Sequence, residues 1–211
     1  MKLKSFGCSF VYGSELSSPL LSWPALLSQD IGRDYQCLAV PGCGNLQIME
    51  SVLLHASHTD FCVINWTWID RFDFVNAADE SWHTVRPALD HEHADYYYRH
   101  LHGQYRDMLT NLVYIHTAMD FLGAQKIPYI MTYMDSLLFA TVQPEWHAPN
   151  AVTYLQQRVK SHLQDFDGQN FLDWSRRQAF AVSPSWHPLE EAHAAAAKLM
   201  LPAIDAILHR A

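Results

Sequence analysis

The sequence has little of what marks several classes of protein. Lysine and arginine number 14 against 22 aspartates and glutamates, which gives a formal net charge of −8. That balance excludes the basic face of a nucleic-acid-binding protein. No apolar run approaches the roughly 20 residues of a membrane-spanning helix, and the chain begins with a strand-like run instead of a signal peptide. We therefore expect a cytoplasmic protein with neither nucleic acid nor a membrane as its partner.

The sequence is also poor in cysteine. Its four cysteines are Cys8, Cys37, Cys43 and Cys62, and they lack the paired spacing of a zinc site. We interpret them as buried, reduced thiols, which agrees with a cytoplasmic location. Cys8 and Cys43 each follow a strand-like run, so we expect both of them near the site described below.

Internal repeats, low-complexity tracts and linker-like segments are absent as well. With 49% hydrophobic and 17% charged residues, the chain has the composition of an ordinary globular protein. Its length suits one domain over residues 1–211. At about 68–103 an aromatic, histidine-rich and acidic stretch is far longer than an ordinary strand-to-helix connection. We interpret it as an insertion that acts either as a lid over the site or as the face of a homo-oligomer.

Strand-length apolar runs alternate with helix-like patterns in the first 66 residues. The expected strands there cover 3–8, 35–40 and 61–66, and the expected helices cover 23–31 and 46–56. This β-α-β-α-β order predicts a parallel sheet with right-handed crossovers. Later patterns add strands at 127–133 and 170–172 and helices at 105–122, 151–166 and 189–208. We predict an α/β fold with a flavodoxin-like sheet of about five strands in the order 2-1-3-4-5.

A serine stands in a small-residue turn directly after the first strand-like run. The turn is Gly7, Cys8 and Ser9. In open α/β sheets, ligands bind at the carboxyl ends of the strands, and in the predicted strand order the loop at 41–45 and the segment after Trp66 meet this turn. We therefore interpret Ser9 as a nucleophile. Cys8 is the alternative nucleophile, but it fits the turn less well.

A serine nucleophile needs a base and donors for the developing oxyanion. His187 lies in the loop that precedes the last expected helix, and the proline that follows it marks the start of that helix. We interpret His187 as the base. The expected oxyanion donors are the backbone N–H groups of Ser9 and of Gly42 or Gly44, where glycine allows close backbone approach. The side chains of Asn45 and Thr67 are expected to add to them.

These motifs resemble those of the SGNH (GDSL-like) hydrolase family. Residues 6–10 (FGCSF) are similar to its first block, with cysteine where the usual aspartate stands, and residues 38–45 (LAVPGCGN) to its glycine block. Residues 63–67 stand at the third block, and residues 186–188 (WHP) resemble the fifth. Trp23-Pro24, and Thr67 with Arg71, agree with a divergent branch that occurs in phage and environmental bacterial sequences.

The resemblance implies a three-layer α/β/α sandwich that hydrolyses carboxylic esters. The implied substrates are small-molecule or carbohydrate esters, including O-acetylated sugars, and no metal or cofactor is needed. Ser9 corresponds to the nucleophile and His187 to the base.

The chain departs from the family pattern at two positions. The third-block asparagine has no match, and Thr67 is the nearest polar residue. The acid that normally stands three residues before the histidine falls on Pro184. Asp173 is the nearest upstream carboxylate, and the carbonyl of Pro184 or Ser185 is the other group able to orient the imidazole. These departures leave open a degenerate member that binds a ligand or partner without turnover.

The insertion offers a further alternative. Its run His91-Glu92-His93 has the spacing of a pair of metal ligands on a strand. Histidines in a charged insertion are more often solvated, and no full ligand set is visible, so we predict no metal. The aromatic residues at 96–98, with Trp82, suit stacking on a sugar or acyl group and equally suit packing or an oligomer face.

Overall fold

The structure is a computed structural model, and it describes residues 1–87, 92–141 and 150–209. Its strands are β1 (Lys2–Phe6), β2 (Tyr35–Cys37), β3 (Asp60–Trp66), β4 (Phe72–Val75), β5 (Trp82–Val85) and β6 (Tyr129–Tyr133). Its α-helices are α1 (Ser9–Tyr12), α2 (Trp23–Asp30), α3 (Asn45–His55), α4 (Glu92–His100), α5 (Gln104–Ala124), α6 (Ala151–Lys160), α7 (Phe171–Arg177) and α8 (Glu190–Leu208). Two 3₁₀ turns cover Pro19–Leu21 and Ser136–Phe139.

The main sheet is parallel and has the order β2-β1-β3-β6 in the described chain. Strand β1 lies between β2 and β3, as predicted. The carboxyl ends of the central strands are in register, since Phe6 is opposite Ile64 and Trp66 is opposite Tyr133. The turn after β1 and the segment after β3 therefore leave the sheet at the same edge.

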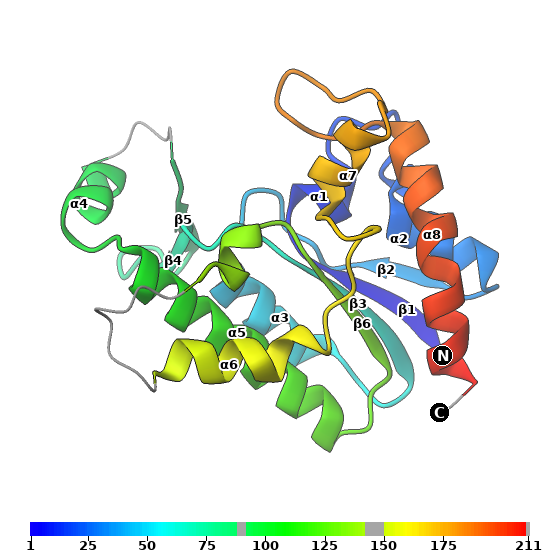
Figure 1. Cartoon of the computed structure of the whole chain (residues 1–211), viewed down its shortest axis with the longest axis horizontal. Coiled ribbons are helices and arrows are strands. Elements are labelled where there is room, and N and C mark those ends of the chain that lie inside the picture. The colour runs from blue at the N-terminus through cyan, green and yellow to red at the C-terminus, as the bar shows by residue number, and fades with distance from the viewer. Residues whose placement is uncertain (88–91, 142–149, 210–211) are drawn as a thin grey trace.

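Helices cover both faces of this sheet. Right-handed crossovers place the β1–β2 connection on one face, and the β2–β3 and β3–β6 connections on the other. Helix α2 packs against α8, whereas α5 packs against both α3 and α6. Figure 1 shows these two groups on opposite sides of the strands. The architecture is the predicted three-layer α/β/α sandwich.

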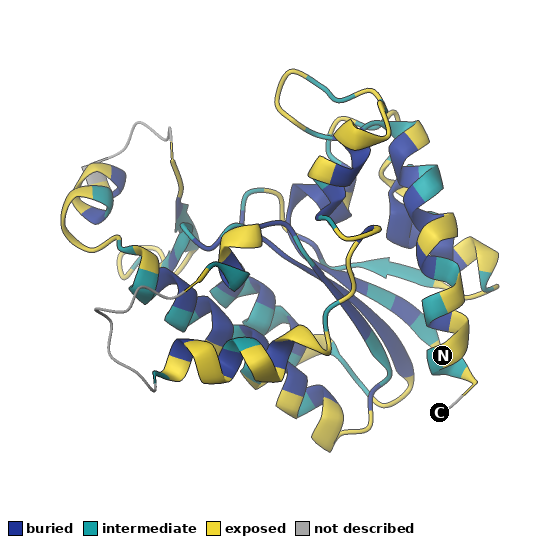
Figure 2. Cartoon of the chain, viewed as in Figure 1, coloured by how far each residue is buried: buried dark blue, intermediate teal, exposed yellow. Residues whose placement is uncertain are grey.

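The sheet and its covering helices enclose the hydrophobic core. Every residue of β3 is buried (Figure 2), which explains why its sequence is a nearly continuous apolar run instead of an alternating one. Asp60 is the charged exception, and its carboxylate lies 2.7 Å from the Lys4 ammonium. Helix α5 contributes a buried stripe at helical spacing that includes Met108, Leu112 and Ile115.

The predicted fifth strand at 170–172 is wrong. Asn170 is the N-cap of α7, and its side chain accepts the backbone N–H of Asp173 at 2.9 Å. A short apolar run such as the one after Asn170 fits a strand or a helix equally well, and the capping residue decides between them. Beyond β6, the described chain adds an isolated parallel bridge between Met131 and Leu163, and a separate antiparallel bridge joins Val182 and Pro188.

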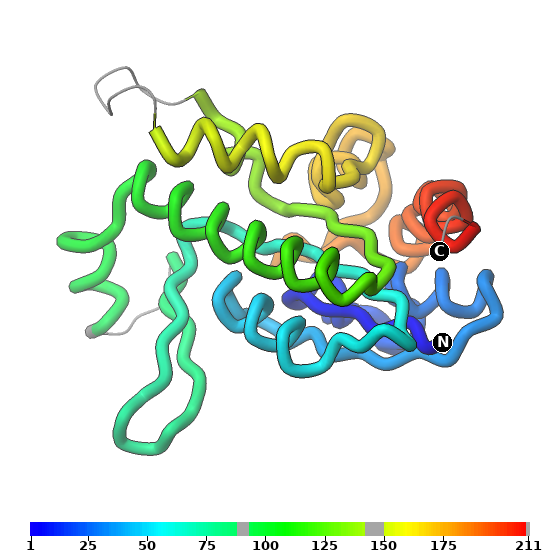
Figure 3. The backbone as a smooth tube through the Cα atoms, turned by 90° about the horizontal axis from the view of Figure 1, so that it is seen from below, coloured from blue at the N-terminus to red at the C-terminus, as the bar shows by residue number. Residues whose placement is uncertain are grey.

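The insertion forms an antiparallel hairpin, β4–β5, followed by α4. The hairpin projects from the body of the protein (Figure 3) and was not predicted, although helix was expected from about Ala94. Asp73 of β4 accepts the backbone N–H of Gly44 at 2.8 Å, and Asp107 of α5 accepts the hydroxyl of Tyr97 at 3.1 Å. These bonds tie the insertion to the body at two points. Its role as an oligomer face stays a prediction.

None of the helices in the described residues has the length and apolar character needed to cross a membrane.

Candidate active site

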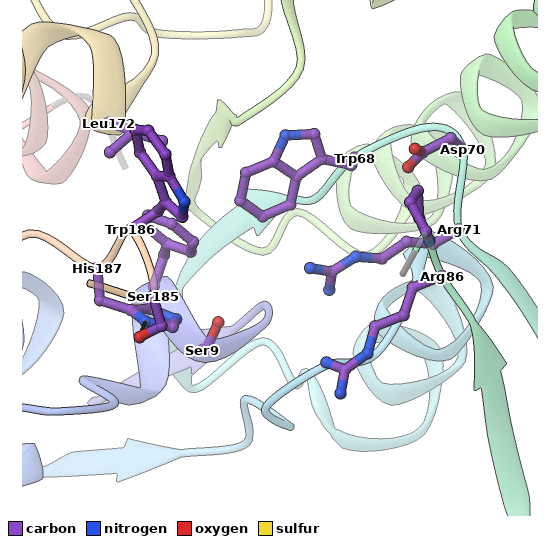
Figure 4. A pocket seen from close by; sticks show the side chains of 11 residues that line it. Ser9, Trp68, Asp70, Arg71, Arg86, Leu172, Ser185, Trp186 and His187 are labelled. Carbon is purple, nitrogen blue, oxygen red and sulfur yellow. Dashed lines mark hydrogen bonds between the residues drawn. The ribbon is translucent and has the colours of Figure 1, made fainter. Parts of the chain in front are cut away.

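A pocket of about 540 Å³ opens at the carboxyl edge of the sheet. Its walls come from α1, the segment after β3, the end of the β4–β5 hairpin, the start of α7 and the turn before α8. Figure 4 shows that Ser9 and His187 lie on one side of this pocket and that Arg71 and Arg86 lie on the other. The two residues predicted to carry the chemistry therefore share one cavity, although they come from opposite ends of the sequence.

Ser9 is positioned by a tight turn between β1 and α1. Gly7 has a φ of 156°, and a Cβ atom there would lie 2.8 Å from Val11 Cγ2 and 3.0 Å from the carbonyl oxygen of Asn65. Only glycine fits that space. Ser9 then begins α1 and is 8% exposed, and its hydroxyl points into the pocket (Figure 4). Its backbone N–H has no acceptor among the described residues.

His187 is held by a hydrogen-bonded turn before α8. The backbone N–H of Ser183 donates to the carbonyl of His187 at 2.9 Å, and the N–H of His187 donates to the hydroxyl of Ser183 at 3.1 Å. Trp186 adopts a φ of 71°, which a bulky residue rarely adopts. The Phe10 ring lies against the imidazole, with 4.9 Å between ring centroids. The imidazole is thus held at the pocket wall by backbone bonds and by an aromatic contact.

Glu15 is the carboxylate that faces His187. Its Oε2 lies 3.4 Å from Nδ1 of His187, and the hydroxyl of Ser185 donates to Oε1. Hydrogen bonds from Ser183 and Ser185 lower the pKa of Glu15, so the carboxylate is ionised. Burial lowers the pKa of His187, and the charge of Glu15 partly offsets that effect. Because Nδ1 faces Glu15, Nε2 is the ring nitrogen left for a substrate.

Asp173, the predicted orienting acid, has other partners. Its carboxylate accepts a bond from Asn170 Nδ2 at 2.7 Å and lies 3.9 Å from the Arg176 guanidinium. Asp173 thus belongs to the first turn of α7, and the carboxylate beside His187 is that of Glu15. Sequence reasoning missed Glu15 because no fixed spacing links it to His187. It lies in the loop after α1, at a φ of 69°.

Gly44 and Asn45, two of the predicted oxyanion donors, are already hydrogen-bonded. The N–H of Gly44 donates to Asp73, and a Cβ atom on Gly44 would lie 2.6 Å from that carboxylate. The side-chain amide of Asn45 donates to the carbonyl of Thr67 at 3.1 Å and to Oδ1 of Asn111 at 2.7 Å. Both amide hydrogens are therefore used. These residues hold the loop after β2 against the segment after β3.

Gly42 and Thr67 differ from those two. Gly42 has a φ of 85°, and its backbone N–H has no acceptor among the described residues. It lines a second hollow that shares Arg86 with the main pocket, so it is the glycine that retains a free donor near the site. The hydroxyl of Thr67 is buried without a described partner, and Thr67 does not line the main pocket.

Several further side chains of the pocket were not assigned a role from the sequence. They include Trp68, Asp70, Arg71 and Arg86. Burial and the nearby Asp135 raise the pKa of the Asp70 carboxyl. Arg71 already stood in the motif of the divergent branch, whereas Arg86 belongs to the insertion. Recognising the β4–β5 hairpin in the sequence would have pointed to Arg86. Strand β5 ends at Val85, directly before this arginine, and so directs it toward the sheet edge.

The alternative raised by the histidines of the insertion is a metal ion held by their side chains. Among the described residues, no three histidine, cysteine or acidic side chains gather as a metal site would require. His91 of the predicted pair lies outside the described residues.

Neither a family model nor a curated protein matches the sequence. Solved structures do match over almost the whole chain. One, from the lipolytic protein G-D-S-L family of Veillonella parvula, is 11% identical, with a TM-score of 0.53 and coverage of 96% of this chain and 97% of that one. The psychrotrophic esterase EstA from Pseudoalteromonas sp. is 13% identical, with a TM-score of 0.54 and coverage of 99% and 98%.

A third match is a carbohydrate esterase family 2 enzyme with a carbohydrate-binding domain, from Corynascus thermopiles (Myceliophthora fergusii). It is 14% identical, with a TM-score of 0.53, and the match covers 99% of this chain and 66% of that one. At such low identities the likeness concerns the fold, which is the same in all three. The chain therefore shares the α/β/α fold of these lipolytic and esterase structures, in agreement with the fold that the motif resemblance predicted.

Proposed function

We propose that the protein is a serine hydrolase that cleaves a carboxylic ester. One observation carries the proposal. Ser9 and His187 come from opposite ends of the sequence and line the same pocket at the carboxyl edge of the sheet, and Glu15 lies beside the His187 imidazole. The arrangement supplies a nucleophile, a base and a carboxylate that orients the base.

In the proposed reaction the Ser9 hydroxyl attacks the ester carbonyl carbon while Nε2 of His187 accepts its proton. The backbone N–H groups of Ser9 and Gly42 donate to the developing oxyanion, and each such donor is worth about 3 kcal/mol in the transition state. The intermediate collapses with loss of the alcohol, which takes the proton from His187. Water, activated by the same imidazole, then hydrolyses the acyl-enzyme and releases Ser9.

The substrate we propose is a small ester, with O-acetylated carbohydrate as one form. Trp68 and Trp186 stand on facing sides of the pocket (Figure 4), and aromatic faces of this kind stack on sugar rings. The Arg176 guanidinium lies 4.0 Å from the centre of the Trp186 ring and holds it in place, although Trp186 is otherwise exposed.

A second candidate function is ligand binding without turnover. The observation that favours it is that no hydrogen bond joins the Ser9 hydroxyl to His187 in the described chain. Catalytic hydrogen bonds often form only once substrate is bound, so this geometry is compatible with both functions.

Labelling with a fluorophosphonate probe tests the proposed hydrolase. We expect the wild-type protein to react at Ser9, and Ser9→Ala to lose both the label and ester turnover. Ser14→Ala is the matched control, because Ser14 lies in the adjacent loop and has no assigned role. A folded wild type that neither reacts nor turns over any ester of a broad panel would overturn the proposal and support the binding function.

A further inference from the structure

Two arginines face the proposed nucleophile across the pocket. Arg71 directly precedes β4 and Arg86 directly follows β5, so they stand at the two ends of the β4–β5 hairpin. Figure 4 shows both side chains on the wall opposite Ser9, with the Arg71 guanidinium directed into the cavity. The chain as a whole carries a formal charge of −8, whereas this wall of the pocket carries two positive charges.

Arg71 is fixed in place and keeps hydrogens for a ligand. Its Nη1 donates to the carbonyl of Cys43 at 2.7 Å, and its guanidinium lies 4.9 Å from the centre of the Trp68 ring. A guanidinium has five N–H donors, so the other donors remain available. The charge of Arg71 also acts on His187, where it lowers the pKa of the imidazole. Arg71 is thus close enough to the base to act on a molecule bound there.

Arg86 stands beside the glycine that retains a free backbone donor. Its Nη1 would lie 2.9 Å from a Cβ atom on Gly42, so glycine at that position makes room for the guanidinium. Arg86 also connects the main pocket with the hollow beside Gly42. This places a positive charge beside the Gly42 N–H, the second expected oxyanion donor.

Neither guanidinium forms an ion pair within residues 1–87, 92–141 and 150–209, where no carboxylate lies within 4.0 Å of either one. Asp70 lines the same pocket without forming an ion pair with Arg71; burial raises the pKa of its carboxyl, and the charge of Arg71 partly offsets that effect. Arg71 is half-buried and Arg86 is exposed, so water hydrates both guanidinium groups in part when the pocket is empty. A ligand that excludes this water would have to supply the compensating negative charge.

We propose that the pocket takes an ester whose acyl or alcohol part ends in an anionic oxygen group, and that Arg71 and Arg86 bind this group. The turnover part of this inference rests on the proposed hydrolase function, whereas the binding part does not. A carboxylate, phosphate or sulfate matches the flat fork of a guanidinium through two parallel hydrogen bonds. The negative surface of the chain would repel such a ligand, and the two arginines supply local attraction.

The test compares two p-nitrophenyl esters that share the same succinyl chain. The mono-p-nitrophenyl ester of succinate carries a free carboxylate, and its methyl ester is neutral. We expect wild type to prefer the charged ester in kcat/KM by about 10-fold or more, which is the discrimination of one good charge-assisted contact. We expect Arg86→Gln to bring the ratio close to 1 and Arg86→Lys to retain part of it.

The control is Arg158→Gln, which removes one exposed positive charge from α6, away from the pocket. It should leave the preference unchanged. The readout is the ratio of kcat/KM for the two esters. A variant that loses activity toward both esters equally therefore leaves the ratio unchanged. If wild type hydrolyses both esters equally well, the inference is overturned and the hydrolase proposal stands.

A binding measurement separates the two proposals when turnover is absent. In Ser9→Ala, the quenching of tryptophan fluorescence reports binding of the uncleaved esters. We expect the charged ester to bind at least about 10-fold more tightly, and the Ser9→Ala/Arg86→Gln double variant to lose this difference. Competition by succinate, inorganic phosphate and sulfate then identifies which anion the arginines prefer. Equal binding of the two esters by Ser9→Ala overturns the inference, whether or not the wild type is an enzyme.

Discussion

Two polar clusters lie at the same edge of the sheet, and they use their hydrogen bonds differently. The open cluster consists of Ser9, Glu15, Ser185 and His187. The closed cluster consists of Gly44, Asn45, Thr67, Asp73 and Asn111. Ser9, Ser185 and His187 line the pocket, with Glu15 behind the imidazole. In the closed cluster every side chain is buried, and Asn45 is only 1% exposed.

The contrast shows which motif residues have hydrogens left for a ligand. Asn45 donates both amide hydrogens within the protein and accepts the N–H of Thr67 at 2.8 Å. Ser9 has its hydroxyl and its backbone N–H free among the described residues. Buried polar groups that are fully bonded stabilise a fold, whereas free groups at a pocket are available for chemistry. The two clusters should therefore respond differently to substitution.

The largest effect on stability is expected from the closed cluster. Asn45→Ala removes three buried hydrogen bonds and leaves groups of Thr67 and Asn111 without partners. Each such orphaned group costs about 1–3 kcal/mol, so we expect the free energy of unfolding to fall by about 3–5 kcal/mol. Urea denaturation measures this loss. Gln47→Ala, on the same helix, is the control and should cost less than about 1 kcal/mol. A wild-type midpoint in Asn45→Ala would contradict the assignment.

The buried histidine of α8 extends the comparison to the pH dependence of stability. His193 of α8 is 1% exposed and accepts the backbone N–H of Trp23 at 3.0 Å, and burial lowers its pKa to about 3. The unfolded chain takes up this proton near pH 6.5, whereas the folded protein does not. This destabilising contribution is therefore absent above pH 6.5 and grows as the pH falls toward 3, at about 1.4 kcal/mol per pH unit.

The measurement is the free energy of unfolding between pH 7 and pH 4. Acidic residues also contribute to acid sensitivity, so the comparison is with His193→Gln, whose amide oxygen is able to accept the same N–H. We expect the variant to have a shallower slope with pH, whatever its stability at pH 7. Parallel curves for the two proteins would mean that His193 does not titrate on unfolding.

Glu15→Gln tests the orienting carboxylate of the open cluster. We expect kcat to fall by about 10-fold or more, but by less than the roughly 10⁴-fold cost of losing a fully buried orienting acid, because Glu15 is partly exposed. Since Glu15 raises the pKa of His187, its loss should also move the acid limb of the kcat/KM profile to lower pH. Glu191→Gln, at the exposed start of α8, is the control. An unchanged pH midpoint would show that Glu15 does not act on His187.

The sequence predicted most of the fold, because the apolar runs and the breakers between them are local signals. The order of β2, β1 and β3 was predicted from the flavodoxin-like pattern of open α/β sheets, and the structure has it. The site was predicted only where a motif marked it, as at Ser9 and His187. The partner of His187 depends on how the loop after α1 docks onto the turn at 183–187, a long-range contact that no spacing encodes. Arg86 depends on a hairpin whose strands are too short to stand out.

The smallest effect on stability and turnover is expected at Thr67. This residue also distinguishes most clearly between the two clusters. Thr67 belongs to the closed cluster through its backbone, but its hydroxyl is buried without a described partner. Thr67→Val replaces it with a methyl group of the same shape, so the free energy of unfolding should rise by about 0–1 kcal/mol. Turnover should stay within about twofold if Thr67 is not an oxyanion donor. Loss of a true oxyanion donor would instead lower kcat by about 10²–10³.

Thr132→Val is the control for stability. That hydroxyl accepts from Asn65 at 2.7 Å, so its loss should cost about 1–3 kcal/mol. A 100-fold fall in kcat in Thr67→Val would instead place Thr67 in the open cluster, as the third oxyanion donor that the motif comparison expected.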